Sequence, residues 1–176
     1  MIYKTKTIIK PADLAGKQNG LLPASLLGTI TGGRLHKNAI AGWKAMCVAA
    51  AKAGILLEPT SSADTYRELA IQERAFFERY SAKPTGSTVT RTYRGQTYWL
   101  KKGYAPSASP GTSNHGWGLA VDIANASGKR FAWLINNANK YGYYIGVGDS
   151  TSPNFEPWHW EYVLGKPYTA PATRKG

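Results

Sequence analysis

Two short segments that each contain a histidine hold most of the residues that could do chemistry. His115 lies in the segment 113–122, and His159 lies in the segment 156–162. Asp122 interrupts an apolar run, where an unpaired carboxylate would be costly, so it needs a cation nearby. A hydrolytic zinc site requires about three nitrogen or oxygen ligands and one open position. Together the two segments favour a metal site.

Each of these residues also has a simpler explanation. A histidine beside glycines, such as His115, is often a loop residue or a hydrogen-bonded core imidazole. Asp122 could pair with an arginine, and the aromatic residues around His159 could belong to the core. Neither HExxH nor CxxC occurs, so the common zinc signatures do not decide between these explanations. The third histidine, His36, has no assigned role and is expected at a helix end.

The N-terminal half is predicted to be mainly helical. Apolar residues recur at helical spacing from residue 37 to 53, and Gly54 is a natural stop. Cys47 falls on this apolar stripe, which predicts a small buried side chain. A short buried strand is expected at 55–57. Residues 60–64 then offer N-caps for a second helix that runs to about residue 80.

The C-terminal half must position the two histidine segments. The pattern predicts a hairpin with strands 88–93 and 96–100, a loop at 105–111, a strand at 119–124, a helix at 128–141 and a last strand at 158–163. Helices and hairpins mix without βαβ repetition, so the fold class is α+β, with a small antiparallel sheet carrying the metal site. We expect one catalytic domain at 1–165 and a tail or linker stub at 166–176.

Composition excludes several classes of protein. The 176 residues include one cysteine, which excludes an internal disulfide and a multi-cysteine zinc site. No apolar run is long enough for a membrane span, and the N-terminus lacks the hydrophobic region of a signal peptide. We therefore expect a chain made in the cytoplasm, without membrane insertion. The net charge of +12 indicates a polyanionic partner, which could be nucleic acid, an anionic membrane surface or an anionic cell wall.

The histidine segments resemble a known pair of motifs. Ser113-x-His115-x-x-Gly118-x-Ala120-x-Asp122 followed by Glu156-x-Trp158-His159 is similar to the signature of the D-alanyl-D-alanine carboxypeptidase family, within the hedgehog/DD-peptidase group. The resemblance extends upstream to Asn19-Gly20-Leu-Leu-Pro23 and to Tyr66-Arg67 with Gln72, and it covers about residues 15–165. It implies that His115, Asp122 and His159 hold Zn²⁺, that Glu156 is the catalytic base, and that Arg67 contacts substrate.

The chemistry of these side chains agrees with the implied roles. A carboxylate near a zinc-activated water can take its proton and deliver it to the leaving amine. Arg67 could clamp a terminal carboxylate or the developing oxyanion. Ser113 is expected to orient either the substrate or the His115 loop, and Trp158 is expected to bind substrate. Strand alternation alone would place Glu161, rather than Glu156, on the face of His159. Pro157 is expected to break that alternation, so we follow the resemblance and assign the base to Glu156.

These observations predict a zinc peptidase that hydrolyses peptidoglycan stem peptides. The simplest activity is release of the terminal D-Ala from D-Ala-D-Ala by a phage-type endolysin that acts on the cell wall after release. An L-Ala-D-Glu endopeptidase is the nearest alternative. A zinc-containing wall-binding module without activity and a basic nucleic-acid-binding domain are alternatives of other classes. We expect a monomer that binds stem peptides and anionic wall polymers, and no nucleic acid, because no nucleic-acid motif is present.

Overall fold

The structure is a computed structural model that describes residues 1–171. Its regular elements are β1 (Leu27–Ile30), β2 (Gly33–His36), α1 (Lys37–Lys52), α2 (Leu69–Arg79), β3 (Tyr80–Ser81), β4 (Thr90–Tyr93), β5 (Gln96–Leu100), β6 (Ala120–Asp122), α3 (Gly128–Asn137), β7 (Tyr143–Ile145) and β8 (His159–Tyr162). Short 3₁₀ turns join them, among them η3 (Ser62–Asp64), η4 (Asn114–Trp117) and η5 (Ala138–Tyr141). No helix in this part of the chain is both long and apolar enough to cross a membrane.

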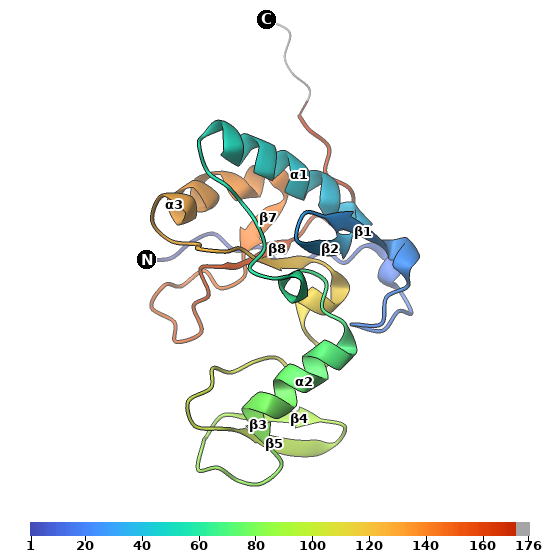
Figure 1. The fold of residues 1–176 in the computed structure, drawn as a ribbon, viewed down its shortest axis with the longest axis vertical. Helices are drawn as coiled ribbons and strands as arrows, with labels where there is room; N and C mark the ends of the chain where they lie inside the picture. The colour runs from blue at the N-terminus through green and yellow to red at the C-terminus, as the bar shows by residue number, and fades with distance from the viewer. Residues whose placement is uncertain (172–176) are drawn as a thin grey trace, which may run out of the picture.

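The strands form three small antiparallel sheets. β1 pairs with β2, β5 lies between β3 and β4, and β8 lies between β6 and β7. Helices α1 and α3 lie beside the β6–β8–β7 sheet (Figure 1). This arrangement confirms the predicted α+β class with a small antiparallel sheet.

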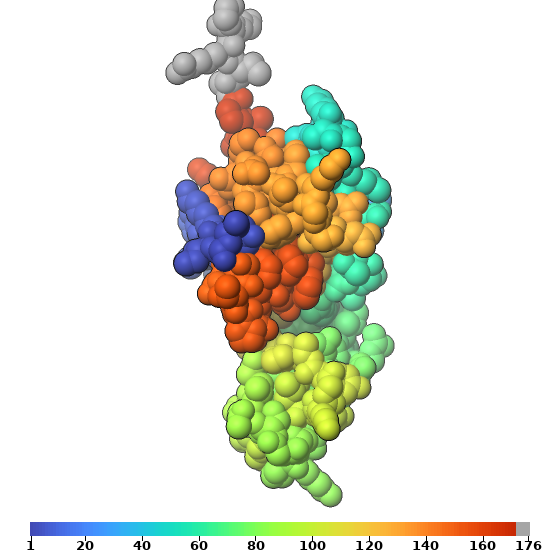
Figure 2. Space-filling view, turned by 90° about the vertical axis from the view of Figure 1, so that its left-hand side faces the viewer, coloured from blue at the N-terminus to red at the C-terminus, as the bar shows by residue number. Residues whose placement is uncertain are grey.

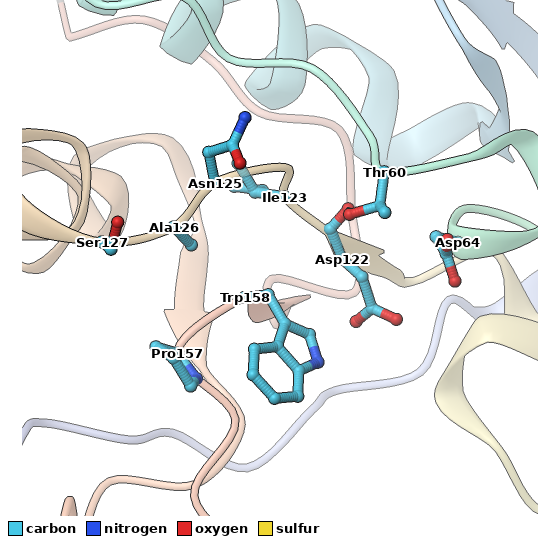
Figure 3. Close-up of a pocket in the computed structure, with 9 residues that line it drawn as sticks. All are labelled: Thr60, Asp64, Asp122, Ile123, Asn125, Ala126, Ser127, Pro157 and Trp158. Atoms are coloured by element: carbon cyan, nitrogen blue, oxygen red, sulfur yellow. The ribbon is translucent and has the colours of Figure 1, made fainter.

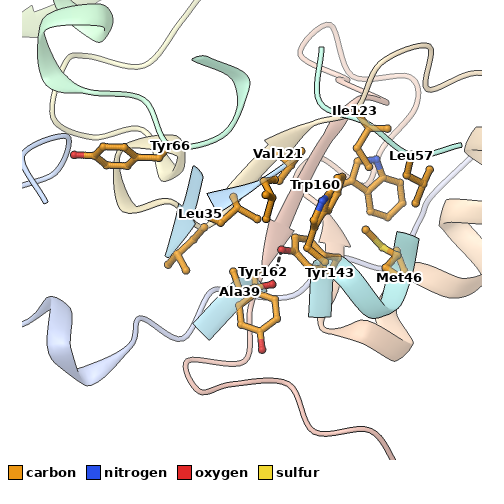
Figure 4. Close-up of a cluster of buried hydrophobic side chains, with 14 of the residues drawn as sticks. Leu35, Ala39, Met46, Leu57, Tyr66, Val121, Ile123, Tyr143, Trp160 and Tyr162 are labelled. Carbon is orange, nitrogen blue, oxygen red and sulfur yellow. Dashed lines mark hydrogen bonds between the residues drawn. The ribbon is translucent and has the colours of Figure 1, made fainter. Parts of the chain in front are cut away.

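The main core lies between the β6–β8–β7 sheet and the helices α1 and α3. It contains buried aromatic and aliphatic side chains from β2, α1, β6, β7, β8 and adjoining loops, several of which Figure 4 shows: Leu35, Met46, Leu57, Val121, Ile123, Tyr143, Trp160 and Tyr162. The Tyr143 hydroxyl donates a hydrogen bond of 3.0 Å to the Ala39 carbonyl of α1, which satisfies a polar atom inside the core. The core therefore fixes the sheet that carries two of the candidate metal ligands.

Truncating Met46 should destabilise the protein by about 2–5 kcal/mol, because Met46→Ala opens a cavity at a side chain that is 0% exposed. The matched control is Val48→Ala on the same helix, where the side chain is 58% exposed and the expected change is below about 0.5 kcal/mol. Urea unfolding of both variants measures the difference. Equal losses in the two variants would contradict this description of the core.

A second, smaller core stabilises a separate part of the molecule. We call residues 69–104, which comprise α2 and β3–β5, the small lobe. Phe76, Tyr80 and Leu100 are its buried hydrophobic residues, and the Phe76 ring stacks on Tyr80 with 4.6 Å between centroids. Figures 1 and 2 show this lobe projecting from the main body, next to the segment that precedes β8.

The hairpin of the small lobe confirms its sequence prediction. Strands β4 and β5 pair as expected, with Tyr93 opposite Gln96 across a two-residue turn. Arg94 and Gly95 both have positive φ, at 49° and 76°, which is the geometry of a type I′ turn. The strand β3, which pairs with β5, was not predicted.

Two sequence expectations are wrong. Residues 55–57 form no strand, since the pairing nearest to them is an isolated bridge between Pro59 and Ile123. Leu57 is nevertheless buried, through side-chain packing alone. The second helix begins at Leu69 and not near residue 64. The Tyr66 N–H bonds the Arg34 carbonyl, and the Arg67 N–H bonds the His115 carbonyl, so this backbone cannot also be helical.

The remaining predicted elements lie close to their expected positions. Helix α1 ends where Gly54 has a φ of +71°, and Cys47 is only partly buried against the core. The predicted helix 128–141 ends as an α-helix at Asn137 and continues as the turn η5. The predicted tail contains no helix or strand at residues 166–171, and its last five residues, 172–176, lie outside the described residues.

Candidate active site

Three elements bring the predicted metal ligands together. The 3₁₀ turn η4 carries His115, and the Ser113 hydroxyl accepts a hydrogen bond of 3.3 Å from the His115 N–H at its start. Gly118 ends this turn with a φ of +65°. Asp122 is the last residue of β6 and lies directly opposite His159, the first residue of β8. The capped turn and the strand register thus place the side chains of His115, Asp122 and His159 close together.

The ligand atoms of His115, Asp122 and His159 all lie within 4.8 Å of one another. Asp122 Oδ1 is 3.3 Å from His115 Nε2 and 2.8 Å from His159 Nδ1. Two imidazole nitrogens and one carboxylate oxygen are a donor set that suits zinc and leaves a coordination position for water or substrate. The structure therefore brings the two histidine segments together, as the sequence predicts.

The other ring nitrogen of each histidine has its own hydrogen-bond acceptor. His115 Nδ1 lies 2.9 Å from the Thr65 carbonyl, and His159 Nε2 lies 3.0 Å from Glu161 Oε1. A proton on each of these nitrogens leaves the lone pair of the opposite nitrogen facing the metal position. Such outer hydrogen bonds are typical of metal-binding histidines because they fix ring orientation and tautomer. The residues present therefore fit a zinc ion.

Burial and mutual hydrogen bonding shift the pKa values of these groups. Burial raises the pKa of Asp122, but hydrogen bonds with His115 and His159 outweigh burial and hold it well below its usual range. Burial lowers the pKa of His115, and Asp122 only partly offsets this. Burial also lowers the pKa of His159, but hydrogen bonds with Asp122 and Glu161 raise it to about 10. A metal ion would replace the proton on His159 Nδ1 as the charge that neutralises Asp122.

The two candidate bases have different surroundings. Glu161 Oε1 contacts His159 Nε2 and accepts a bond of 2.7 Å from the Asn114 amide, so its carboxylate is already engaged. Glu156 precedes β8 in a turn closed by a bond from the His159 N–H to the Glu156 carbonyl. This turn replaces the strand alternation that the spacing argument assumed. Burial raises the pKa of Glu156 above that of an exposed carboxyl group, which favours its acting as a proton acceptor and donor.

Arg67 lies beside the metal ligands. Its guanidinium donates bonds of 2.8 Å to the Ala63 carbonyl and 2.9 Å to Asp64, and it lies 3.6 Å from Asp122 Oδ2. The side chain is therefore held in place by the turn η3. Asp64 was predicted only as a helix cap, and its pairing with Arg67 had no distinct signal in the sequence.

The three candidate ligands, Arg67 and Glu156 face one cleft of about 710 Å³ between the main body and the small lobe. Its lining includes Ser113, His115, Glu156, Trp158 and His159. A second hollow, whose lining residues Figure 3 shows, shares Asp64, Asp122 and Trp158 with the cleft. Trp158 is 42% exposed, so its indole forms a wall that either hollow can use. The arrangement can bind an extended chain across a metal position.

His36 lies away from the cleft. It is fully buried as the N-cap of α1, where its Nδ1 accepts from the Asn38 N–H and its Nε2 lies 3.1 Å from Asp13. The expectation of a helix-end residue is confirmed. The Thr65 carbonyl, which contacts His115, and the Asn114 amide, which bonds Glu161, were not predicted, because a backbone carbonyl or an amide carries no motif of its own.

Comparison with known proteins gives consistent matches. A family model described as VanY, D-alanyl-D-alanine carboxypeptidase, matches residues 32–166. A D-alanyl-D-alanine carboxypeptidase of Enterococcus faecalis is 32% identical over 112 residues, which are 57% of this chain and 39% of that protein. The chain therefore spans about two fifths of the length of this relative.

Two solved structures share the fold. The LD-carboxypeptidase LdcB is 25% identical with a TM-score of 0.60, covering 93% of this chain and 84% of its own. The vancomycin-resistance D,D-pentapeptidase VanY, solved with Zn(II), is 22% identical with a TM-score of 0.53, covering 93% and 86%.

Proposed function

Because the chain belongs to the D-alanyl-D-alanine carboxypeptidase family, we propose that it is a zinc-dependent peptidase of peptidoglycan stem peptides. The proposed reaction is release of the terminal D-Ala from a stem that ends in D-Ala-D-Ala. The observation that carries the proposal is the group of His115, Asp122 and His159, which shares a cleft with the free carboxyl group of Glu156.

His115, Asp122 and His159 would hold the zinc ion. Zinc bound there would supply Lewis acidity, which polarises a carbonyl group and makes water more acidic. Glu156 acts as the base that removes a proton from the attacking water and returns it to the leaving amine. Arg67 donates to the terminal carboxylate or to the developing oxyanion, since its planar fork is already oriented by Asp64. Ser113 orients the His115 turn, and Trp158 packs against the substrate.

The proposal is tested by incubating the zinc-loaded protein with a synthetic stem pentapeptide and with purified walls, followed by mass spectrometry of the products. Loss of one D-Ala supports the proposal. New N-terminal D-Glu would instead identify the alternative L-Ala-D-Glu endopeptidase. Zinc binding without any cleavage would identify a wall-binding module, and tight DNA binding without zinc would identify a nucleic-acid-binding domain.

The acidic limb of the pH–rate profile should lie above the ordinary glutamate range near 4.5. Glu156 works as a base only when deprotonated, and burial raises its pKa, so kcat/KM should fall with decreasing pH earlier than for an exposed glutamate. Initial rates on a soluble stem peptide between pH 4 and 8 measure this limb. A limb at or below the ordinary range would contradict the role of Glu156.

We also propose a lysin role, in which the chain degrades the wall as a phage-type endolysin. The net charge of +12 supports this, because a basic surface would hold the protein to anionic wall polymers. Raising the salt concentration from about 0.05 to 0.5 M should then lower activity on whole walls more than activity on a soluble peptide. Equal losses on the two substrates would mean that the charge serves only solubility.

A further inference from the structure

The cleft has a second wall that the proposed reaction does not use. Arg79, at the end of α2, and Arg91, on β4, both line the same cleft as His115, His159 and Glu156. Both arginines belong to the small lobe, whereas the metal group belongs to the main body.

These two arginines are half-buried, and neither has an acidic partner. Within residues 1–171, no carboxylate lies within 4.0 Å of Arg79 or Arg91. In contrast, Arg67 pairs with Asp64, and Arg94 on the exposed turn pairs with Glu73. Two partly desolvated cations that face the same cleft favour an anion as occupant.

The hydrogen bonds of the two arginines leave donors free. Arg79 donates from one terminal nitrogen to the Ala105 carbonyl at 3.3 Å. Arg91 donates from Nε to the Ser107 carbonyl at 3.0 Å and from one terminal nitrogen to the Thr90 carbonyl at 2.9 Å. A guanidinium has five N–H donors, so each side chain keeps donors for a ligand while its position is fixed by backbone carbonyls.

Arg79 and Arg91 differ from Arg67 in their position relative to the metal ligands. In a carboxypeptidase the terminal carboxylate lies one residue from the reacting carbonyl, close to the metal ligands, where Arg67 lies 3.6 Å from Asp122. Arg79 and Arg91 bond none of the three ligands and stand on the opposite lobe. A peptide that extends from the metal group across the cleft reaches them with residues on the N-terminal side of the scissile bond.

We propose that Arg79 and Arg91 form a specificity site for a carboxylate of the stem peptide on the N-terminal side of the scissile bond. This inference rests on the proposed peptidase function. The chemical candidate is the free α-carboxylate of a D-Glu residue that is linked through its side chain. Amidation of that group removes the charge, so the site would distinguish acidic from amidated stem peptides.

The test compares two synthetic stem pentapeptides that differ only in whether this carboxylate is free or amidated. The variants are Arg79→Gln and Arg91→Gln, since glutamine keeps an N–H donor for the loop carbonyls but has no charge. Each variant should raise KM for the acidic peptide about tenfold and leave KM for the amidated peptide unchanged, because one charge-assisted hydrogen bond is lost. Arg74→Gln, on the exposed face of α2 and outside the cleft, is the matched control and should change neither value.

The outcomes separate the two proposals. If the variants weaken both peptides equally, the arginines serve only to hold the 105–107 loop, and the inference is wrong while the peptidase function stands. If the wild-type protein prefers the amidated peptide, or cleaves both peptides with the same KM, the specificity site is also excluded. Failure of the wild-type zinc protein to cleave either peptide would instead reject the proposed function.

Discussion

Replacing Glu156 with glutamine should lower kcat by about 10²–10⁴-fold while zinc content stays at the wild-type level. The carboxylate of Glu156 faces the cleft and contributes no ligand atom to the group formed by His115, Asp122 and His159. Glutamine has nearly the same shape but cannot accept the proton of water, so the chemical step should fail while substrate still binds. Single-turnover hydrolysis of a stem pentapeptide, together with metal analysis of the same sample, measures both quantities.

Glu161→Gln is the control for this experiment, because the two glutamates differ in what they contact. Glu161 orients His159 through a 3.0 Å contact with Nε2, so its replacement should weaken zinc affinity by about 10–100-fold and be rescued by added zinc. Full activity of Glu156→Gln combined with an unrescued loss in Glu161→Gln would assign the base to Glu161. That result would favour the strand-alternation argument over the turn that the structure shows.

Removal of the metal should abolish hydrolysis and lower thermal stability. A zinc ion that binds only the folded chain stabilises it by about 2.7 kcal/mol when free zinc is 100 times its Kd. For a chain of this size, that corresponds to a change in Tm of about 5–10 °C. Calorimetry before and after treatment with a chelator measures the shift, and activity should return when zinc is added back.

His115→Ala provides the matched variant for metal removal. It deletes one nitrogen ligand at a side chain that is 3% exposed, so it should bind little zinc and show no zinc-dependent rise in Tm. Retention of full activity in the chelated wild-type protein, verified as metal-free, would reject zinc chemistry at this site.

Much of the candidate site could be predicted from sequence because its residues lie in two short segments. The spacing from Ser113 to Asp122 specifies a capped turn that leads into a strand, and the structure contains both. The order of Glu156 and His159 identified the second segment. Strand alternation nevertheless misplaced Glu156, because Pro157 lies inside a turn whose geometry a period-2 pattern does not describe.

The parts that could not be predicted depend on pairing between distant residues. Thr65 reaches His115 across 50 positions, and its own backbone conformation prevents α2 from starting earlier. The strands β1, β2 and β7 are only three or four residues long, which is too short for an alternating pattern to identify them. Arg79 and Arg91 lie 12 positions apart and meet one cleft only because β4 folds back beside α2.

The small lobe contains its own buried aromatic cluster, which packs separately from the core that holds the metal ligands. Phe76, Tyr80 and Leu100 hold the lobe together without sharing side chains with the core that fixes the metal ligands. Substitutions on the cleft side of this lobe can therefore accumulate without disturbing the residues that break the peptide bond. The lobe is accordingly the segment to exchange when building chimeras that retarget a family member to a different wall chemotype.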